Sequence, residues 1–146
     1  MRVVLLEMSR PRKAPKRSTC YRKWINKREF DFERRQYVPL VTSDDLDDLH
    51  RWLKTKKIDY LDTDPHELVN LKLVQEAFDA LAKLLWNDSI ELPLNSYTLK
   101  HRMKRHMPTY WHCSTHQAVL AASLYGCTVD FGPKKLRDGF TPTVYK

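Results

Sequence analysis

Histidine and cysteine gather in one short stretch of the C-terminal third of this sequence. His101, His106, His112, Cys113 and His116 follow one another in the spacing H-x4-H-x5-H-C-x2-H. Imidazole nitrogen and thiolate sulfur are ligands of tetrahedral Zn²⁺ sites, and the metal-ligand candidates are His101, His112, Cys113 and His116. The spacing matches no zinc finger, zinc ribbon or HExxH motif, and helix positions five apart lie about 140° apart around the axis. We therefore expect no cofactor, with a zinc site as the alternative.

Cys113 is also a candidate nucleophile, because it lies just before a predicted helix. A helix N-terminus can lower the pKa of a thiol, and His112 or His116 could act as its base. The sequence marks no third group to orient such a base, and it contains no Walker loop, GxGxxG or GxSxG motif. We therefore expect a structural thiol and a protein that is not an enzyme. A small metal-dependent nuclease is the remaining catalytic alternative.

The distribution of charge favours a different kind of function. The chain has 146 residues and a formal net charge of +8, divided into +8 over residues 1–37, −6 over residues 38–95 and +6 over residues 96–146. Two basic blocks are typical of a polyanion-binding protein, because Lys and Arg neutralise phosphates. The acidic middle block fits helix caps and a solvated surface, or a surface that docks on a basic protein.

Candidate nucleic-acid contacts fall in three groups. The first lies in a proline-containing basic segment and the residues that follow it: Arg12, Lys13, Lys16, Arg17, Arg22 and Lys23. The second occupies two predicted helices, with cations for phosphates and polar side chains for base edges: Lys100, Arg102, Lys104, Arg105, Thr115, His116 and Gln117. The third lies in the basic turn GPKKLRDG: Lys134 and Lys135.

Aromatic residues are interleaved with cations in the segment that follows the N-terminal basic run. They are Tyr21, Trp24, Phe30, Phe32 and Tyr37. In such a pattern the rings can stack on bases while the cations hold phosphates. Tyr21, Trp24 and Arg28 also sit at helical spacing, so the rings could equally anchor this segment to the core.

Capping residues and apolar spacing predict four helices, over residues 43–57, 64–86, 96–106 and 114–126. The expected N-caps are Ser43, Asp64, Asn95 or Ser96, and Ser114. Gly126 suits the left-handed position that ends a helix. Residues 127–131 and 140–145 alternate like strands, which predicts a β-hairpin within residues 127–145.

The last two predicted helices have the character of a helix-turn-helix unit over residues 96–126. The first is strongly basic, and the second is short and rich in alanine. In this interpretation the first helix lies along phosphates, the start of the second reads base edges, and the hairpin forms a wing beside it. The connector of about seven residues is longer than the usual three or four.

The whole pattern predicts a mainly α-helical fold. We expect a basic N-terminal arm and anchoring segment over residues 1–37 and a small helical domain over residues 38–146. No apolar run is long enough to span a bilayer, and Val3–Leu6 is too short for a secretory signal. Three cysteines without a CxxC pair fit free thiols. We therefore expect a cytoplasmic protein, or a nuclear one in a eukaryotic host, that is not secreted.

Two strings in the helix-turn-helix region carry a resemblance. SYTLKH at 96–101 and AASLYG at 121–126 resemble the motif pair SYxLKH and AAxxxG of small helical proteins encoded by phages and plasmids. The resemblance covers about 30 residues, and the glycine-containing turn usual before the second helix is replaced here by CSTHQ. It implies a viral or mobile-element origin and no particular activity.

These patterns together predict a non-enzymatic nucleic-acid-binding protein, a DNA-binding regulator of viral or mobile-element origin. The ligand is DNA or RNA, and no membrane is involved. The alternative is a protein-binding inhibitor or adaptor, which docks on a host or viral partner through its basic and acidic surfaces.

Overall fold

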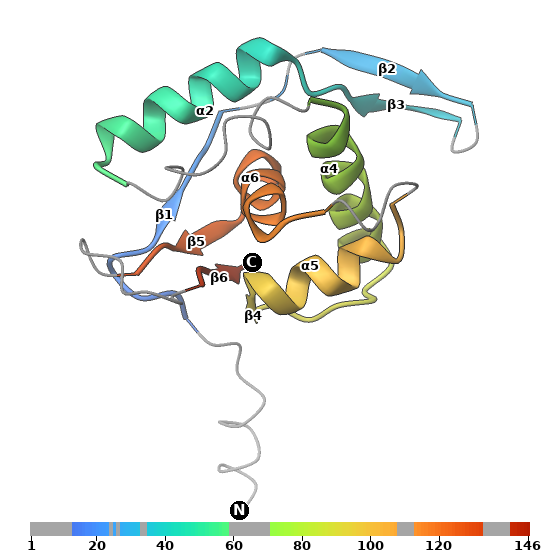
Figure 1. Ribbon diagram of the computed structural model, residues 1–146. Helices are drawn as coiled ribbons and strands as arrows, with labels where there is room; N and C mark the ends of the chain where they lie inside the picture. Colours follow the sequence, from blue (N-terminus) through green and yellow to red (C-terminus); the bar gives the residue numbers. More distant parts are fainter. Residues whose placement is uncertain are drawn as a thin grey trace, which may run out of the picture.

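The computed structural model describes residues 13–23, 25, 27–32, 35–58, 71–107, 113–132 and 141–146. At the centre of the fold lies the helix α6, Thr115–Tyr125, with the other elements arranged around it (Figure 1). Its residues are apolar or small on every side, and such a helix is stable only when it is enclosed. Every residue from Gln117 to Leu124 is buried.

Two helices pack directly on α6: α4, Leu71–Trp86, and α5, Ser96–Lys104. α4 buries Val74, Phe78 and Leu81. α5 buries Leu99 and Met103. The predicted start of the second helix, over residues 64–67, lies outside the described residues.

A four-stranded antiparallel sheet lies beside these helices, with the strand order β1-β5-β6-β4. The strands are β1 (Thr19–Cys20), β4 (Leu94–Asn95), β5 (Thr128–Asp130) and β6 (Thr143–Tyr145). β5 and β6 are the two strands of the predicted hairpin, and they pair as expected. They form the middle of a larger sheet, however, because β1 and β4 add to their outer edges. Cross-strand partners Val129 and Val144 are both buried in the core.

A second, two-stranded sheet is formed by β2 (Arg28–Asp31) and β3 (Gln36–Pro39). This hairpin extends away from the body of the molecule at the upper right of Figure 1. Together the two sheets make the fold mixed α/β, so the prediction of a mainly α-helical fold is wrong. β1 and β4 have two residues each, too few to produce a recognisable alternation, and they become strands only because distant partners align with them.

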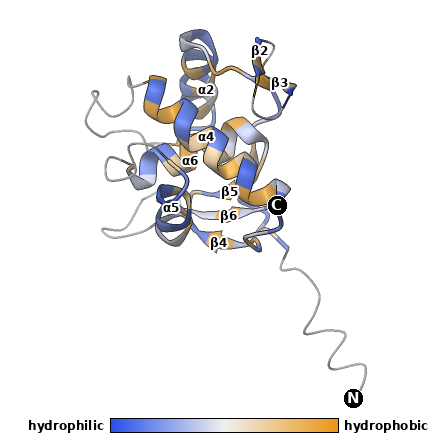
Figure 2. Cartoon of the chain, turned by 90° about the vertical axis from the view of Figure 1, so that its right-hand side faces the viewer, coloured by the Kyte–Doolittle hydropathy of each residue, from blue (hydrophilic) through white to orange (hydrophobic). Residues whose placement is uncertain are grey.

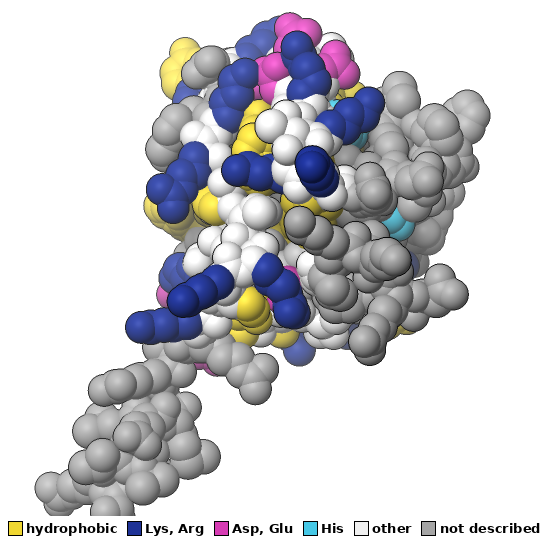
Figure 3. Space-filling model, turned by 90° about the vertical axis from the view of Figure 1, so that its left-hand side faces the viewer, with side chains coloured by type: hydrophobic (Ala, Val, Ile, Leu, Met, Phe, Trp, Pro, Cys, Tyr) yellow, Lys and Arg dark blue, Asp and Glu magenta, His cyan; other side chains and the backbone are white. Residues whose placement is uncertain are grey.

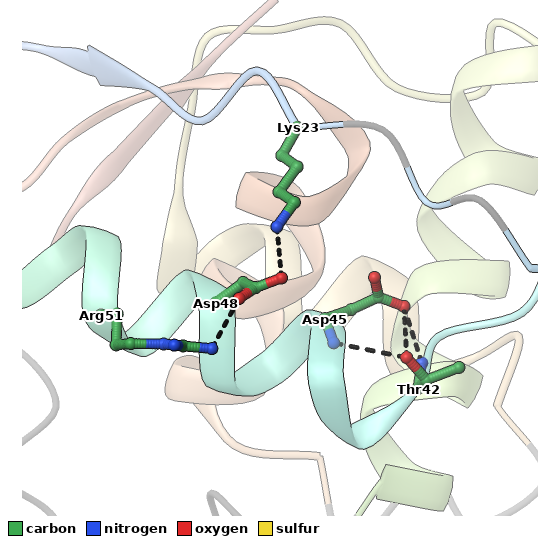
Figure 4. A network of polar contacts seen from close by, with 5 residues as sticks. All are labelled: Lys23, Thr42, Asp45, Asp48 and Arg51. Carbon is green, nitrogen blue, oxygen red and sulfur yellow. Dashed lines mark hydrogen bonds and ion pairs between the residues drawn. The ribbon is translucent and has the colours of Figure 1, made fainter.

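α2 (Ser43–Thr55) packs against the core and buries Leu46, Leu49 and Leu53. Its N-cap is Thr42, one residue before the predicted Ser43. The Thr42 hydroxyl accepts a hydrogen bond from the Asp45 amide at 3.3 Å, and the Asp45 carboxylate accepts one from the Thr42 amide at 2.8 Å (Figure 4). This reciprocal pair is a capping box, with Asp in place of the usual Glu or Gln.

The surroundings of α6 do not clearly match a helix-turn-helix unit. The helix itself begins and ends as predicted, with a capping box between Ser114 and Gln117 and with Gly126 left-handed at φ 97°. A recognition helix must expose one side to a DNA groove, whereas α6 is enclosed over residues 117–124. The small side chains Ala118, Ala121 and Ala122 allow close packing in the core and are no sign of a DNA-reading surface.

The outer surfaces are polar over much of the molecule. In Figure 2, α5 is coloured mainly as hydrophilic, and the β2–β3 hairpin stands apart from the helices. Among the described residues, no helix is both long enough and apolar enough to cross a membrane.

Candidate nucleic-acid interface

The N-terminal cations that the sequence singles out have different surroundings. Lys13 and Lys16 are exposed, while Arg12 lies outside the described residues. Arg17 forms a bidentate ion pair with Asp130 of β5, with Nε–Oδ1 at 2.9 Å and Nη2–Oδ2 at 3.1 Å. The Asp130 side chain is only 7% exposed. The hydrogen bond from Arg17 and the backbone N–H of Gly132 hold the pKa of Asp130 below its usual value.

Lys23 and its neighbours belong to a second ion-pair network (Figure 4). Its ammonium group contacts one oxygen of Asp48 on α2, and Arg51 contacts the other oxygen at 2.7 Å. The hydrogen bond from Lys23, with the charges of Lys23 and Arg51, lowers the pKa of Asp48. Tyr21 lies edge-on to Trp52, with ring centroids 5.3 Å apart. Residues 21–23 are thus fastened to α2, and Tyr21 is the core anchor that one interpretation of the aromatic pattern predicts.

The exposed side of α5 carries the second predicted group of cations. Arg102 and Arg105 are exposed, and Lys104 is half-buried. The Lys100 ammonium lies 4.5 Å from the centre of the Tyr97 ring, and His101 meets the same ring edge-on at 4.6 Å. Partial desolvation, with Lys100 and Lys104 nearby, lowers the pKa of His101.

The predicted base-reading residues at the start of α6 are less accessible. Gln117 is 1% exposed, and its Oε1 accepts a hydrogen bond from the Ser114 backbone N–H at 3.0 Å. Gln117 is therefore enclosed in this structure, where its side chain is part of the capping box of α6. Thr115 and His116 are half-buried. Lys134 and Lys135 lie outside the described residues.

Cys113 is buried, and burial raises the pKa of its thiol to about 11. This direction is opposite to the one that an activated nucleophile needs, because thiolate is the reactive form. Of the candidate zinc ligands, His101 is exposed on α5, His116 is half-buried on α6 and His112 lies outside the described residues. Among the described residues, no three His, Cys, Asp or Glu side chains form a group that could hold a metal ion.

The surface contains a groove that could not be predicted from the sequence. We call it the arginine groove; its volume is about 740 Å³, and it lies between the segment after β1, the ends of β2 and β3, and the C-terminal end of α6. The lining residues that matter here are Tyr21, Arg22, Lys23, Arg28, Phe78 and Tyr125. Among the described residues that line it there is no Asp or Glu. Arg22 and Arg28 are both exposed, and neither has a carboxylate partner within the described part of the chain.

A second groove adjoins the first. This tryptophan groove has a volume of about 600 Å³ and lies between β3 and the C-terminal half of α4. It is lined by Tyr37, Pro39, Phe78, Lys83, Trp86 and Tyr125, together with Asp79 as the one acid among its described residues. Pro39, Phe78 and Tyr125 line both grooves, so the two are continuous. The interleaved aromatic and cationic residues of the segment 21–37 indicate part of this surface. Local sequence patterns cannot show that Trp86 and Tyr125, which are distant in the sequence, lie beside that segment.

No protein-family model matches the chain, and no curated protein or solved structure is similar enough to match it.

Proposed function

We propose that this protein is a non-enzymatic nucleic-acid-binding protein and that the two adjoining grooves are its interface. The observation that carries the proposal is the composition of the arginine groove, where cations and aromatic rings line one hollow without a carboxylate. Cations placed beside aromatic rings suit a ligand that has both a charged backbone and flat bases.

The surrounding surface supports the same ligand. Figure 3 shows Lys and Arg side chains spread over the face on which α2 ends and β1 lies. The exposed lysines at the end of α2, Lys54, Lys56 and Lys57, contribute to the positive charge of the molecule without lining either groove. Such a field draws a polyanion toward the surface, and the grooves then provide close contacts.

The test is binding of a fluorescently labelled oligonucleotide at several salt concentrations. The double variant Arg22→Ala/Arg28→Ala should lose about tenfold or more in affinity at low salt. Its salt slope should fall by about 1.4 on a single strand or about 1.8 on B-DNA, because each of the two phosphate contacts adds about 0.7 or about 0.9. The charge-matched control is Lys54→Ala/Lys56→Ala, which removes two exposed cations outside the grooves. Equal losses in both variants would show that only net charge matters and would refute the grooves as the interface.

A further inference from the structure

We infer that the ligand of the two grooves is a single strand of nucleic acid whose bases stack on the exposed rings; the inference rests on the proposed function. It starts from the kind of apolar surface that the protein exposes. The large hydrophobic side chains exposed among the described residues are all aromatic: Phe30, Phe32, Tyr37, Trp86, Tyr97 and Tyr125. Flat rings of this kind are the platforms on which unpaired bases stack.

Five of these six rings lie on or beside the grooves. Tyr37, Trp86 and Tyr125 line the tryptophan groove, and Tyr37 and Trp86 are 66% and 82% exposed. Phe30 and Phe32 continue the series along the hairpin, where Phe32 is 83% exposed. The sixth ring, Tyr97, lies on α5 under Lys100 and lines neither groove.

The register of the hairpin places two rings and one cation, Arg28, on one side. Arg28 is paired with Pro39, and Phe30 with Tyr37, so these four side chains share one face of the two-stranded sheet. Glu29 and Asp31 alternate with them and belong to the opposite face. Arg28 and Pro39 line the arginine groove, which shows that the basic and aromatic face is the one turned toward it.

Four of the five exposed rings at the grooves already contact another aromatic ring. Phe30 lies 5.0 Å from Phe32 and 5.2 Å from Tyr37, both edge-on, and Phe78 lies 5.7 Å from Tyr125. Rings fixed by such contacts lose little rotamer entropy when a base stacks on them.

The bases of a duplex cannot stack on these rings, because each base is stacked between its neighbours and its flat face is hidden. Side chains then reach only the base edges in the grooves. The helix predicted to read those edges, α6, is buried over residues 117–124, whereas the β2–β3 hairpin is an exposed strand pair, so the experiment below includes duplex DNA. Unpaired bases can turn toward Tyr37, Trp86 and Tyr125 while Arg22 and Arg28 hold the phosphates.

The experiment compares fluorescein-labelled single-stranded DNA, single-stranded RNA and duplex DNA of one mixed sequence, with the full chain at low salt. We expect tighter binding of the single strands than of the duplex. Tyr37→Ala and Trp86→Ala should each weaken single-strand binding by about tenfold, as stacked bases lose their platform, while Tyr37→Phe and Trp86→Phe keep most of it. Tyr97→Ala is the matched control, an exposed ring outside the grooves, and it should change binding by less than about twofold.

The outcomes separate the inference from the proposed function. If duplex and single strands bind equally and the two alanine variants are neutral, while Arg22→Ala/Arg28→Ala weakens binding, the single-strand inference is refuted and the proposed function stands. If no nucleic acid binds at low salt, both are refuted, and the exposed rings are to be explained as a protein-docking surface. Circular dichroism checks that each variant is folded, which we expect because the substituted side chains are exposed.

Discussion

Individual residues of the same type have different roles here because their surroundings differ. Arg17 and Arg22 are both cations of the N-terminal basic block. Arg17 is bound to the buried carboxylate of Asp130 and belongs to the fold, whereas Arg22 faces the arginine groove without a carboxylate among the described residues. The cysteines show the same dependence, since burial raises the pKa of Cys113 to about 11 and that of Cys127 to about 12.

From the Arg17–Asp130 ion pair we predict that the free energy of unfolding decreases at acidic pH. The pKa of Asp130 is lowered in the folded state, chiefly because Arg17 hydrogen-bonds to it. The contribution of the ion pair to the free energy of unfolding is therefore complete above about pH 4, the pKa of Asp in the unfolded chain. It is lost as the pH falls through the pKa of Asp130 in the folded state. We expect Asp130→Asn to be less stable than the wild type near neutral pH and to lose less further stability when the pH is lowered.

The measurement is urea unfolding at about pH 7 and about pH 3, on either side of the unfolded pKa. Lys16→Ala is a suitable control, because Lys16 is exposed in the same segment and no carboxylate partner is found for it among the described residues. A wild type and an Asp130→Asn variant that lose equal stability on acidification would contradict the role given to this ion pair.

At the scale of elements, α6 shows that local sequence patterns can predict the ends of a helix without predicting its surroundings. Ser114, Gln117 and Gly126 mark its ends, because caps act within a few residues. The burial of its residues 117–124 depends on contacts with α4, α5 and the sheet. These contacts cannot be inferred from the sequence of α6 itself. The helix is therefore the centre of the core, and the candidate interface lies at its C-terminal end, around Tyr125.

A substitution of Gln117 tests whether α6 is a core helix or a helix that contacts bases. Gln117→Ala removes the side chain that accepts the Ser114 N–H, so it should destabilise the protein by about 1–3 kcal/mol and should not change the order of preference among oligonucleotides. Urea unfolding and oligonucleotide binding provide the two measurements, with Thr115→Ala as the neighbouring control. A stable Gln117→Ala variant with altered sequence preference would restore the helix-turn-helix interpretation.

At the scale of the whole molecule, the N-terminal segment contributes both to the packing of the fold and to the candidate interface. β1 forms an edge of the main sheet by pairing with β5, and Tyr21 and Lys23 contact α2. The same segment supplies Arg22 and Lys23 to the arginine groove. The first 37 residues therefore contribute both to the stability of the body and to its candidate interface.

Two truncations test where the structural part of this segment begins. A chain without residues 1–12 keeps Arg17 and β1, so its free energy of unfolding should match that of the full chain, while the loss of Arg2, Arg10 and Arg12 should weaken oligonucleotide binding and flatten its salt slope. A chain without residues 1–18 also loses Arg17, which leaves the Asp130 carboxylate buried without its counter-ion. It should unfold at a lower urea concentration, and equal midpoints for the two truncations would contradict this placement.

The sequence by itself determined the features that depend on neighbouring residues. The helices, their caps at Asn95 and Ser114, the left-handed Gly126 and the strands β5 and β6 were predictable, because capping and alternation act over a few positions. The excess of positive charge is likewise a property of composition.

Only the tertiary structure decided which of these elements form a surface. Strands β1 and β4 exist because β5 and β6 pair with them, α6 is interior because other elements enclose it, and the grooves bring Arg22, Arg28, Trp86 and Tyr125 together from four separate segments. Such long-range contacts form when packing buries apolar surface over the whole chain, and no local window of sequence contains that information.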